Sequence, residues 1–245
     1  PTTIPVNLEV VAKGSPAICY QCVLDNGTFV PGDTVAQGDV MVVKGDQLSF
    51  SAFTTGPAPP LATQVGGATV LVNGKAAPLF YSSYGQLAFQ MPVDTPAGTA
   101  LVQVQRDSLT SNTVSVNVAA RAPRIIAVVN QDGSVNLPDS SHPAHAGDTL
   151  VIYAIGLGST SPAVATGAPA PGAEPLARVT GAITVNFGAS VTAPEIVPDF
   201  AGLTPGFAGL YQVNVRVPDK APKGLVNLSV SFPDSRSNSL NIAIQ

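Results

Sequence analysis

Two stretches of this sequence repeat each other and decide its fold. Residues 86–92 read QLAFQMP, and residues 212–218 read QVNVRVP. In both, apolar residues alternate with mostly polar ones until a proline. A period of two is typical of a half-buried β-strand, and proline ends the strand because it cannot donate to the ladder. Each stretch therefore predicts a strand with one buried face.

The repeat continues beyond these strands. Residues 86–118 align with residues 212–244 without a gap, and seven of the 33 positions are identical, against about two expected by chance from average residue usage. The identities are Gln86/Gln212, Pro92/Pro218, Pro96/Pro222, Gly98/Gly224, Val104/Val230, Ser111/Ser237 and Asn112/Asn238. The apolar triplets of the first copy are Leu87, Phe89 and Met91, then Ala100, Val102 and Val104, then Val114, Val116 and Val118, and each has an apolar counterpart 126 residues later.

The repeat predicts an all-β protein of two tandem immunoglobulin-like β-sandwich domains. About seven short strands with frequent turn signals per copy are typical of that fold. We expect an N-terminal domain over residues 1–120, with an extra strand segment at residues 1–12, and a C-terminal domain over residues 121–245. Gly45-Asp46 and Gly147-Asp148 look alike, and we expect each to lead into a strand, over residues 48–53 and 150–155. The second copy also carries an extra loop between Gly156 and Leu176.

The composition excludes several classes of protein. Charged residues make up 11% of the 245, against about 25% in an ordinary domain, and the net charge is −4. A chain with 45% hydrophobic residues is not disordered, and without a basic excess it is not expected to bind nucleic acid. No apolar run is long enough to span a membrane, which takes about 20 residues. Gly and Pro, 23 of each, fit turns between short strands.

Cys19 and Cys22 are the only cysteines. Three interpretations are open: a redox pair, free thiols, or a structural disulfide formed in an oxidising compartment. The strand-like surroundings favour the disulfide, since a redox pair wants a helix N-terminus. Residues three apart in an extended strand lie about 10 Å apart, too far to bridge, so a disulfide predicts a tight turn at Tyr20-Gln21.

The second half resembles the Solibacter-type uncharacterised C-terminal domain family of secreted acidobacterial proteins. The matching residues are Gly147-Asp148 before a strand, Gly156-Leu157-Gly158, residues 202–218 (GLTPGFAGLYQVNVRVP), Pro222 to Gly224 and Ser237-Asn238. The resemblance covers residues 123–245, and residues 45–118 look like a divergent copy. Both halves resemble, more loosely, bacterial cell-surface immunoglobulin-like domains of the IPT/TIG type. The resemblance implies a sandwich fold and export, and implies no catalytic residues.

The candidate chemical sites have plain structural alternatives. His142 and His145, with Asp139 and Asp148 nearby, are either metal ligands or an exposed loop, and we favour the loop. Asp25, Asp33, Asp39 and Asp46 are either a calcium site or turn residues, and we favour turns. We therefore expect no catalytic, cofactor-binding or metal-ligating residues. Tyr81 and Tyr84, flanking Ser82-Ser83 in an expected loop, are the best candidates for a ligand-binding loop, with coverage of a sandwich edge as the alternative.

The N-terminal segment alternates strictly. Ile4, Val6, Leu8 and Val10 fall on one face of a strand, with Pro5, Asn7 and Glu9 on the other. Such a segment either pairs within its own chain or donates a strand to a neighbouring subunit, where main-chain hydrogen bonds and alternate side chains hold it. A head-to-tail interface of the second kind propagates as a fibre. Sparse surface charge favours association.

These observations predict a non-enzymatic, secreted or cell-surface structural protein. We expect it to self-assemble into a filament or surface layer by N-terminal donor-strand addition, with other copies of itself as partners. The alternative is a cell-surface adhesion or carbohydrate-binding module, with a polysaccharide or another surface component as partner. Its binding loops would be residues 81–85 or 156–176. No cofactor, nucleic acid or membrane span is expected under either alternative.

Overall fold

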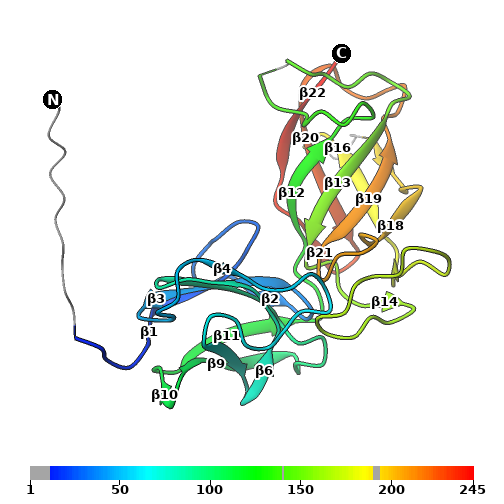
Figure 1. Cartoon of the computed structure of the whole chain (residues 1–245). Helices are drawn as coiled ribbons and strands as arrows, with labels where there is room; N and C mark the ends of the chain where they lie inside the picture. Colours follow the sequence, from blue (N-terminus) through cyan, green and yellow to red (C-terminus); the bar gives the residue numbers. More distant parts are fainter. Residues whose placement is uncertain (1–11, 140, 190–193) are drawn as a thin grey trace, which may run out of the picture.

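The computed structural model describes residues 12–139, 141–189 and 194–245. The regular structure of these residues consists of β-strands, arranged as two immunoglobulin-like β-sandwiches in tandem (Figure 1). The all-β prediction is confirmed. Among the described residues there is no helix with the length and apolarity needed to cross a bilayer.

The first sandwich packs a five-stranded sheet, in the order β1-β3-β8-β7-β4, against a six-stranded sheet, in the order β2-β11-β9-β5-β6 with β10 on β9. Its strands are β1 (Ala17–Asp25), β2 (Val35–Ala36), β3 (Val40–Asp46), β4 (Thr54–Thr55), β5 (Ala68–Val72), β6 (Lys75–Ala77), β7 (Leu79–Ser82), β8 (Gln86–Gln90), β9 (Gly98–Arg106), β10 (Leu109–Thr110) and β11 (Val114–Ala119). All the pairings are antiparallel except β2 with β11, which is parallel.

The second sandwich packs a sheet in the order β12-β13-β19-β18-β15-β14 against one in the order β17-β16-β20-β21, with β22 on β20. Its strands are β12 (Arg124–Val129), β13 (Thr149–Ile155), β14 (Thr160–Ser161), β15 (Arg178–Val179), β16 (Thr184–Phe187), β17 (Glu195–Ile196), β18 (Phe200–Leu203), β19 (Tyr211–Arg216), β20 (Gly224–Phe232), β21 (Ser235–Arg236) and β22 (Leu240–Ile244). A single parallel bridge, Ala144 to Ile244, takes the place that β2 has in the first sandwich.

The repeated residues make the same hydrogen bonds in both sandwiches. The amide of Val104 donates to Ser111 Oγ, and the amide of Val230 donates to Ser237 Oγ, both at 2.9 Å. The side chain of Asn112 accepts from the backbone N–H of Ile18 and donates to its C=O. Asn238 makes the same two hydrogen bonds with Ile125. Ser-Asn therefore ties the last strand of each sandwich to its first strand, which explains why these two residues recur.

The core follows the predicted alternation. Each sandwich has its own cluster of buried apolar residues, running from Ile18 to Val118 in the first and from Ile125 to Ile244 in the second. Leu87, Phe89 and Met91 are fully buried, as are their counterparts in β19 and just after it. Burying each large aliphatic or aromatic side chain contributes about 1.5–3 kcal/mol of stabilisation, which holds the two layers together.

The predicted strand over residues 48–53 is wrong. Gly45-Asp46 are the last two residues of β3 and no strand follows them directly, whereas Gly147-Asp148 does precede β13. Gln47 takes a left-handed φ of 54° and breaks the extended chain. The hydroxyl groups of Ser49 and Ser51 then donate to the backbone carbonyl of Gly66. Side-chain bonds of this kind compete with a ladder, so the segment bends although its residues alternate.

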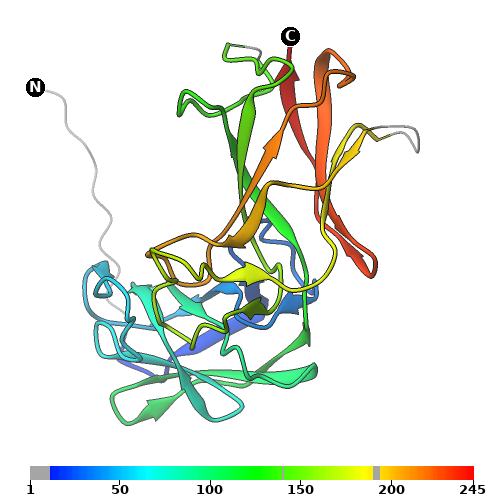
Figure 2. The same ribbon diagram turned by 90° about the vertical axis from the view of Figure 1, so that its right-hand side faces the viewer.

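The extra loop of the second sandwich returns to the first. Both views place the segment around β14 beside the first sandwich, and specific hydrogen bonds join the two (Figures 1 and 2). The amide of Leu61 donates to the carbonyl of Gly167 at 2.8 Å, and the amide of Val93 donates to Thr166 Oγ1 at 3.0 Å. The loop therefore braces the joint between the two sandwiches in addition to the short link between Ala119 and Arg124.

Candidate functional site

A groove opens on one side of the first sandwich, between the edges of its two sheets. It has a volume of about 490 Å³ and lies between β1 and β11. The core residues Val23 and Val116 and the partly buried Val114 line it, and its polar residues include Gln21 and Asn112. A volume of this size falls within the range of about 300–1,000 Å³ that is usual for ligand sites.

The backbone of β11 is the notable feature of this groove. β11 pairs with β9 along Val114–Val118, but on its other side it meets β2 only at Val118 and Ala119. The carbonyl of Ala119 accepts from Gln37 on the β2 side. Because N–H and C=O groups of alternate residues point the same way in a strand, the backbone N–H and C=O of Ser115 also face that side. No described strand pairs with Ser115 there.

A disulfide shapes the opposite rim of the groove. Cys19 and Cys22 are bonded, with their Cα atoms 5.2 Å apart. Gln21 between them has a φ of 54°, so the chain turns tightly there, and the pairing of β1 with β3 shifts register between Ile18 and Val23. The bulge carries Tyr20 outward, with 87% of its surface exposed at the groove.

The outer edge of β22 in the second sandwich, which matches the outer edge of β11, is covered by a side chain. Asn136 accepts from the amide of Ala243 at 2.7 Å and donates to its carbonyl at 3.0 Å, and the amide of Ala144 donates to that carbonyl as well. Asn136 thus caps this edge of β22 as a strand would. The two sandwiches share one topology, but the described residues cover their last strands to different extents.

The chain enters the first sandwich at the pole that faces away from the second. Ala12 and Gly14 both bond to the side chain of Gln47, at 3.0 and 2.7 Å. Arg106 donates to the carbonyls of Gly14 and Gln47, and its guanidinium lies 4.0 Å from the centre of the Phe50 ring. Arg106 is 1% exposed. The sequence gives one signal for this: Arg106 occupies the repeat position of the apolar Phe232.

The expected assembly residues Ile4, Val6, Leu8 and Val10 lie outside the described residues. What the structure does fix is the anchor that follows them, residues 12–14. The end of the described chain at Gln245 lies at the other pole of the molecule, where its amide donates to Ala144 (Figure 1). The two ends of the described chain are therefore at opposite poles.

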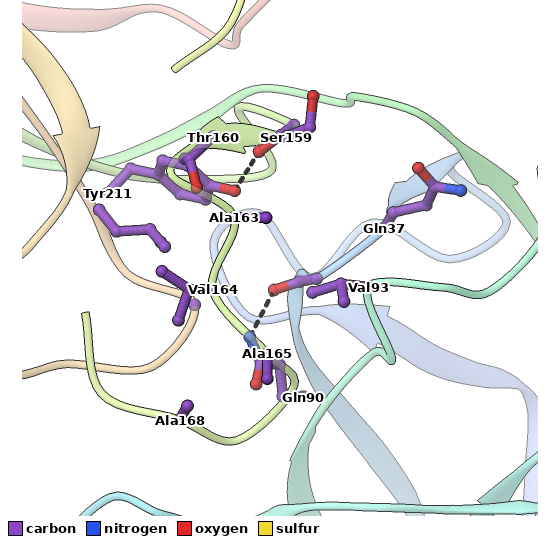
Figure 3. Close-up of a pocket in the computed structure, with 14 residues that line it drawn as sticks. Gln37, Gln90, Val93, Ser159, Thr160, Ala163, Val164, Ala165, Ala168 and Tyr211 are labelled. Carbon is purple, nitrogen blue, oxygen red and sulfur yellow. Dashed lines mark hydrogen bonds between the residues drawn. The ribbon is translucent and has the colours of Figure 1, made fainter. Parts of the chain in front are cut away.

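A second, smaller cavity lies in the joint between the sandwiches. It has a volume of about 180 Å³, below the usual range for ligand sites. Figure 3 shows Gln37 and Val93 of the first sandwich on one side of it and Thr160 and Tyr211 of the second on the other. Gln90 is buried beside it and joins the two sandwiches, donating to Gly38 at 3.1 Å and accepting from the amide of Gly167 at 2.6 Å.

Buried charge also gathers at this joint. Arg124 pairs with Asp33 at 3.1 Å and with Asp25 at 3.8 Å. Asp39 is fully buried, and burial raises its pKa to about 7, with the nearby charge of Asp25 adding to the rise. Burial, and secondarily the charge of Asp39, raises the pKa of Tyr211. The hydroxyl of Tyr211 donates to the carbonyl of Gly158.

The candidate acidic residues act in turns and ion pairs. Asp25 accepts from the amides of Gly27 and Thr28 and from the Thr28 hydroxyl, which is turn chemistry. Asp33 pairs with Arg124, and Asp39 bonds to the amides of Ala36 and Val40. Asp46 ends β3. Within the described ranges, no group of three or more His, Cys, Asp or Glu side chains is placed to hold a metal ion.

The two histidines lie on an exposed loop of the second sandwich. His142 Nδ1 lies 3.1 Å from Ser141 Oγ, and His145 Nδ1 lies 3.5 Å from Asp148 Oδ2. Asp139 accepts from the amide of Ser141. These contacts are local to the loop and lie in a shallow depression with Asn130 and Asp148.

Tyr81, which is half-buried, and Tyr84, which is exposed, each lie beside an exposed phenylalanine ring. Tyr81 lies in β7 rather than in a loop, since it pairs with Ala88 of β8, and Tyr84 follows in the turn. The Tyr81 ring lies 5.0 Å from Phe53 and the Tyr84 ring 6.2 Å from Phe50. Phe53 is 64% exposed and Phe50 45%. Sequence reasoning missed both phenylalanines because it placed them in a strand.

Comparison with known proteins leaves the family open. No protein-family model and no curated protein matches the chain, so the acidobacterial resemblance stays a prediction. Among solved structures, it is similar to the Bacteroides ovatus mixed-linkage glucan utilization locus protein SGBP-B, bound to a heptasaccharide. The identity is 10%, the TM-score is 0.37, and 86% of this chain and 43% of that one are covered.

Two further structures are comparably distant. SGBP-B from a xyloglucan utilization locus of Bacteroides uniformis has 11% identity and a TM-score of 0.30, with 94% of this chain and 49% of that chain covered. Domains 5–6 of the S-layer protein SbsC have 14% identity and a TM-score of 0.28, with 94% and 98% covered. The chain spans less than half the length of both SGBP-B proteins. Likenesses this weak carry no conclusion about ligands or partners.

Proposed function

We propose that this chain is a non-enzymatic, extracellular structural protein that self-assembles by donating its N-terminal segment to a neighbouring copy. The observation that carries the proposal is the combination of an alternating segment at residues 3–10 with an anchor at residues 12–14 that lies at one pole of the molecule. A donor at one pole and an acceptor elsewhere give a head-to-tail interface that does not close on itself.

The first sandwich supports the proposal because its described strands account for the whole fold. β1, β3, β5, β7, β8, β9 and β11 supply the seven strands of an immunoglobulin-like sandwich. A sandwich with these seven strands can take a further strand from a neighbouring copy at an open edge.

The disulfide and the sparse charge support an extracellular location. Disulfides persist in oxidising compartments, and the Cys19–Cys22 bond lies on the surface beside exposed Tyr20. With 11% charged residues, the chain carries few charges, which lowers the electrostatic repulsion between copies.

Deletion of residues 1–11 tests the proposal. We expect the full chain to form filaments or large oligomers in negative-stain images, and the shortened chain to be a folded monomer. The deletion leaves Ala12 and its bond to Gln47 in place. Assembly of the shortened chain to the same size would contradict the proposal.

A second candidate function is carbohydrate binding or adhesion through the aromatic cluster. Its support is the exposure of Phe53 and Phe50 next to Tyr81 and Tyr84, because exposed apolar patches mark interaction sites. On a glycan array we expect binding that Phe53→Ala together with Tyr81→Ala removes, while Phe207→Ala, at an exposed ring of the second sandwich, keeps it. An array without hits for the full chain would contradict this candidate.

A further inference from the structure

We propose that the acceptor site is the groove between β1 and β11 of the first sandwich, and that its occupant is residues 3–10 of a second copy. This inference rests on the proposed function and specifies its interface. The donated strand would add to β11 beside Ser115, and its apolar face of Ile4, Val6, Leu8 and Val10 would lie toward the apolar side chains of the groove.

β11 has an open edge beside Ser115 among the described strands. An unpaired strand edge is a template for a further strand, and the N–H and C=O of Ser115 face outward without a described strand beside them. β2 already pairs with the far end of β11, at Val118 and Ala119. An added strand would therefore extend β2 along the same edge.

The residues that line the groove include both polar and apolar side chains. Strand addition needs backbone partners along the edge and apolar contacts for every second side chain. Val23 and Val116 line the groove as residues of the core and Val114 is partly buried there, beside the polar Gln21 and Asn112. In residues 3–10 the apolar and polar side chains alternate without interruption.

A second copy supplies the strand in this proposal. Ala12 is held by Gln47, past the last rung of β1, where Ala17 pairs with Asp46. A segment donated from that anchor to a neighbour makes a head-to-tail contact, which can propagate, whereas a segment that filled the groove of its own chain could not.

The corresponding edge of the second sandwich is partly occupied by a side chain. Asn136 already bonds to both the N–H and the C=O of Ala243 on β22. Ala243 lies two residues beyond Asn241, which holds the repeat position of Ser115. This pair of positions provides a matched control on the same element of the fold.

Ser115→Pro tests the acceptor directly. Proline removes the outward N–H and is tolerated in edge strands, while the bonds of β11 to β9 come from the alternate residues and stay. We expect Ser115→Pro to reduce assembly at least tenfold and Asn241→Pro to leave it unchanged. Normal assembly by Ser115→Pro, with loss of assembly on deletion of residues 1–11, would overturn this inference and leave the proposed function standing.

Complementation separates donation between copies from pairing within one chain. The chain without residues 1–11 keeps the acceptor, and Ser115→Pro keeps the donor. Each alone should be a monomer, and an equimolar mixture should form a one-to-one dimer by light scattering. A mixture that stays monomeric would overturn the inference, and assembly of the shortened chain alone would overturn the proposed function as well.

Amide hydrogen exchange gives a readout that survives a folding defect in Ser115→Pro. We expect the Ser115 amide to exchange at least tenfold more slowly in the assembled full chain than in the chain without residues 1–11. The Asn241 amide should exchange equally in both. Equal exchange at Ser115 would overturn the inference.

Discussion

Asp39 is the residue whose surroundings give the clearest pH dependence. Its carboxylate is fully buried, accepts from the amides of Ala36 and Val40, and has a pKa of about 7 in place of the ordinary 3.8. Because the folded-state pKa is the higher one, the native state binds more protons than the unfolded state between about pH 4 and 7. Stability therefore falls as pH rises through this window.

We expect the free energy of unfolding to fall by at least ~1.4 kcal/mol between pH 5 and pH 8, which corresponds to one pKa unit. Asp39→Asn cannot ionise and should lose most of that slope. Urea unfolding at the two pH values measures both quantities. An unchanged slope in Asp39→Asn would show that another group titrates.

Asn112 and Asn238 make the repeat testable one residue at a time. Each side chain donates to and accepts from the backbone of one residue in the first strand of its sandwich. Loss of these bonds leaves partly buried backbone groups unpaired, at a cost of about 1–3 kcal/mol. We expect Asn112→Ala and Asn238→Ala to destabilise their sandwiches by similar amounts in urea unfolding, and Asn117→Ala, an exposed amide on β11, to have little effect.

The sequence pattern predicted the strands whose buried face is a run of alternate apolar residues. It missed the segments whose conformation depends on a few individual hydrogen bonds. The buried faces of β8, β9 and β11 could be read from the sequence because each is a run of alternate apolar residues. Ser49 and Ser51 alternate too, yet their bonds to Gly66 bend the chain. Arg106 is buried because two carbonyls and an aromatic ring surround it, and those partners lie far away in the sequence.

At the scale of elements, the loop that carries β14 sets the joint between the sandwiches. The side chain of Gln90 accepts a hydrogen bond from the amide of Gly167, which lies 77 residues away in the sequence. No local sequence pattern predicts a contact between residues so far apart. We expect Gln90→Ala to loosen the loop, so that the amide of Gly167 exchanges at least tenfold faster. Gln86→Ala, on the same strand but bonded to Tyr81 within the first sandwich, is the control. Unchanged exchange at Gly167 would mean that Leu61 and Thr166 hold the loop without Gln90.

The sequence likewise predicted some features of the candidate site and missed others. The sequence pointed to Cys19, Cys22 and the alternating N-terminal face, because spacing alone distinguishes them. It could not identify the groove, since the groove depends on how far β2 extends along β11 and on the bulge in β1. It also could not show that Asn136 covers the equivalent edge in the second sandwich, a bond that spans 107 residues.

At the scale of the whole molecule, the two sandwiches form one unit that would be joined to its neighbours by a donated strand. The Gln90 bridge and the Arg124 ion pairs fix one sandwich on the other. The N-terminal anchor lies at one pole and the end of the described chain at the other (Figure 1). Copies joined through such an anchor repeat a fixed unit, which suits a filament.

In the proposed assembly, one apolar face of residues 3–10 holds the copies together. Leu8→Lys places a charge on the apolar face, and Asn7→Lys places the same charge one residue away on the polar face. The most direct test is the molar mass of the two variants and the unaltered chain by light scattering. We predict that Leu8→Lys is a monomer while Asn7→Lys assembles like the unaltered chain. Equal masses for the two variants would contradict assembly through this apolar face.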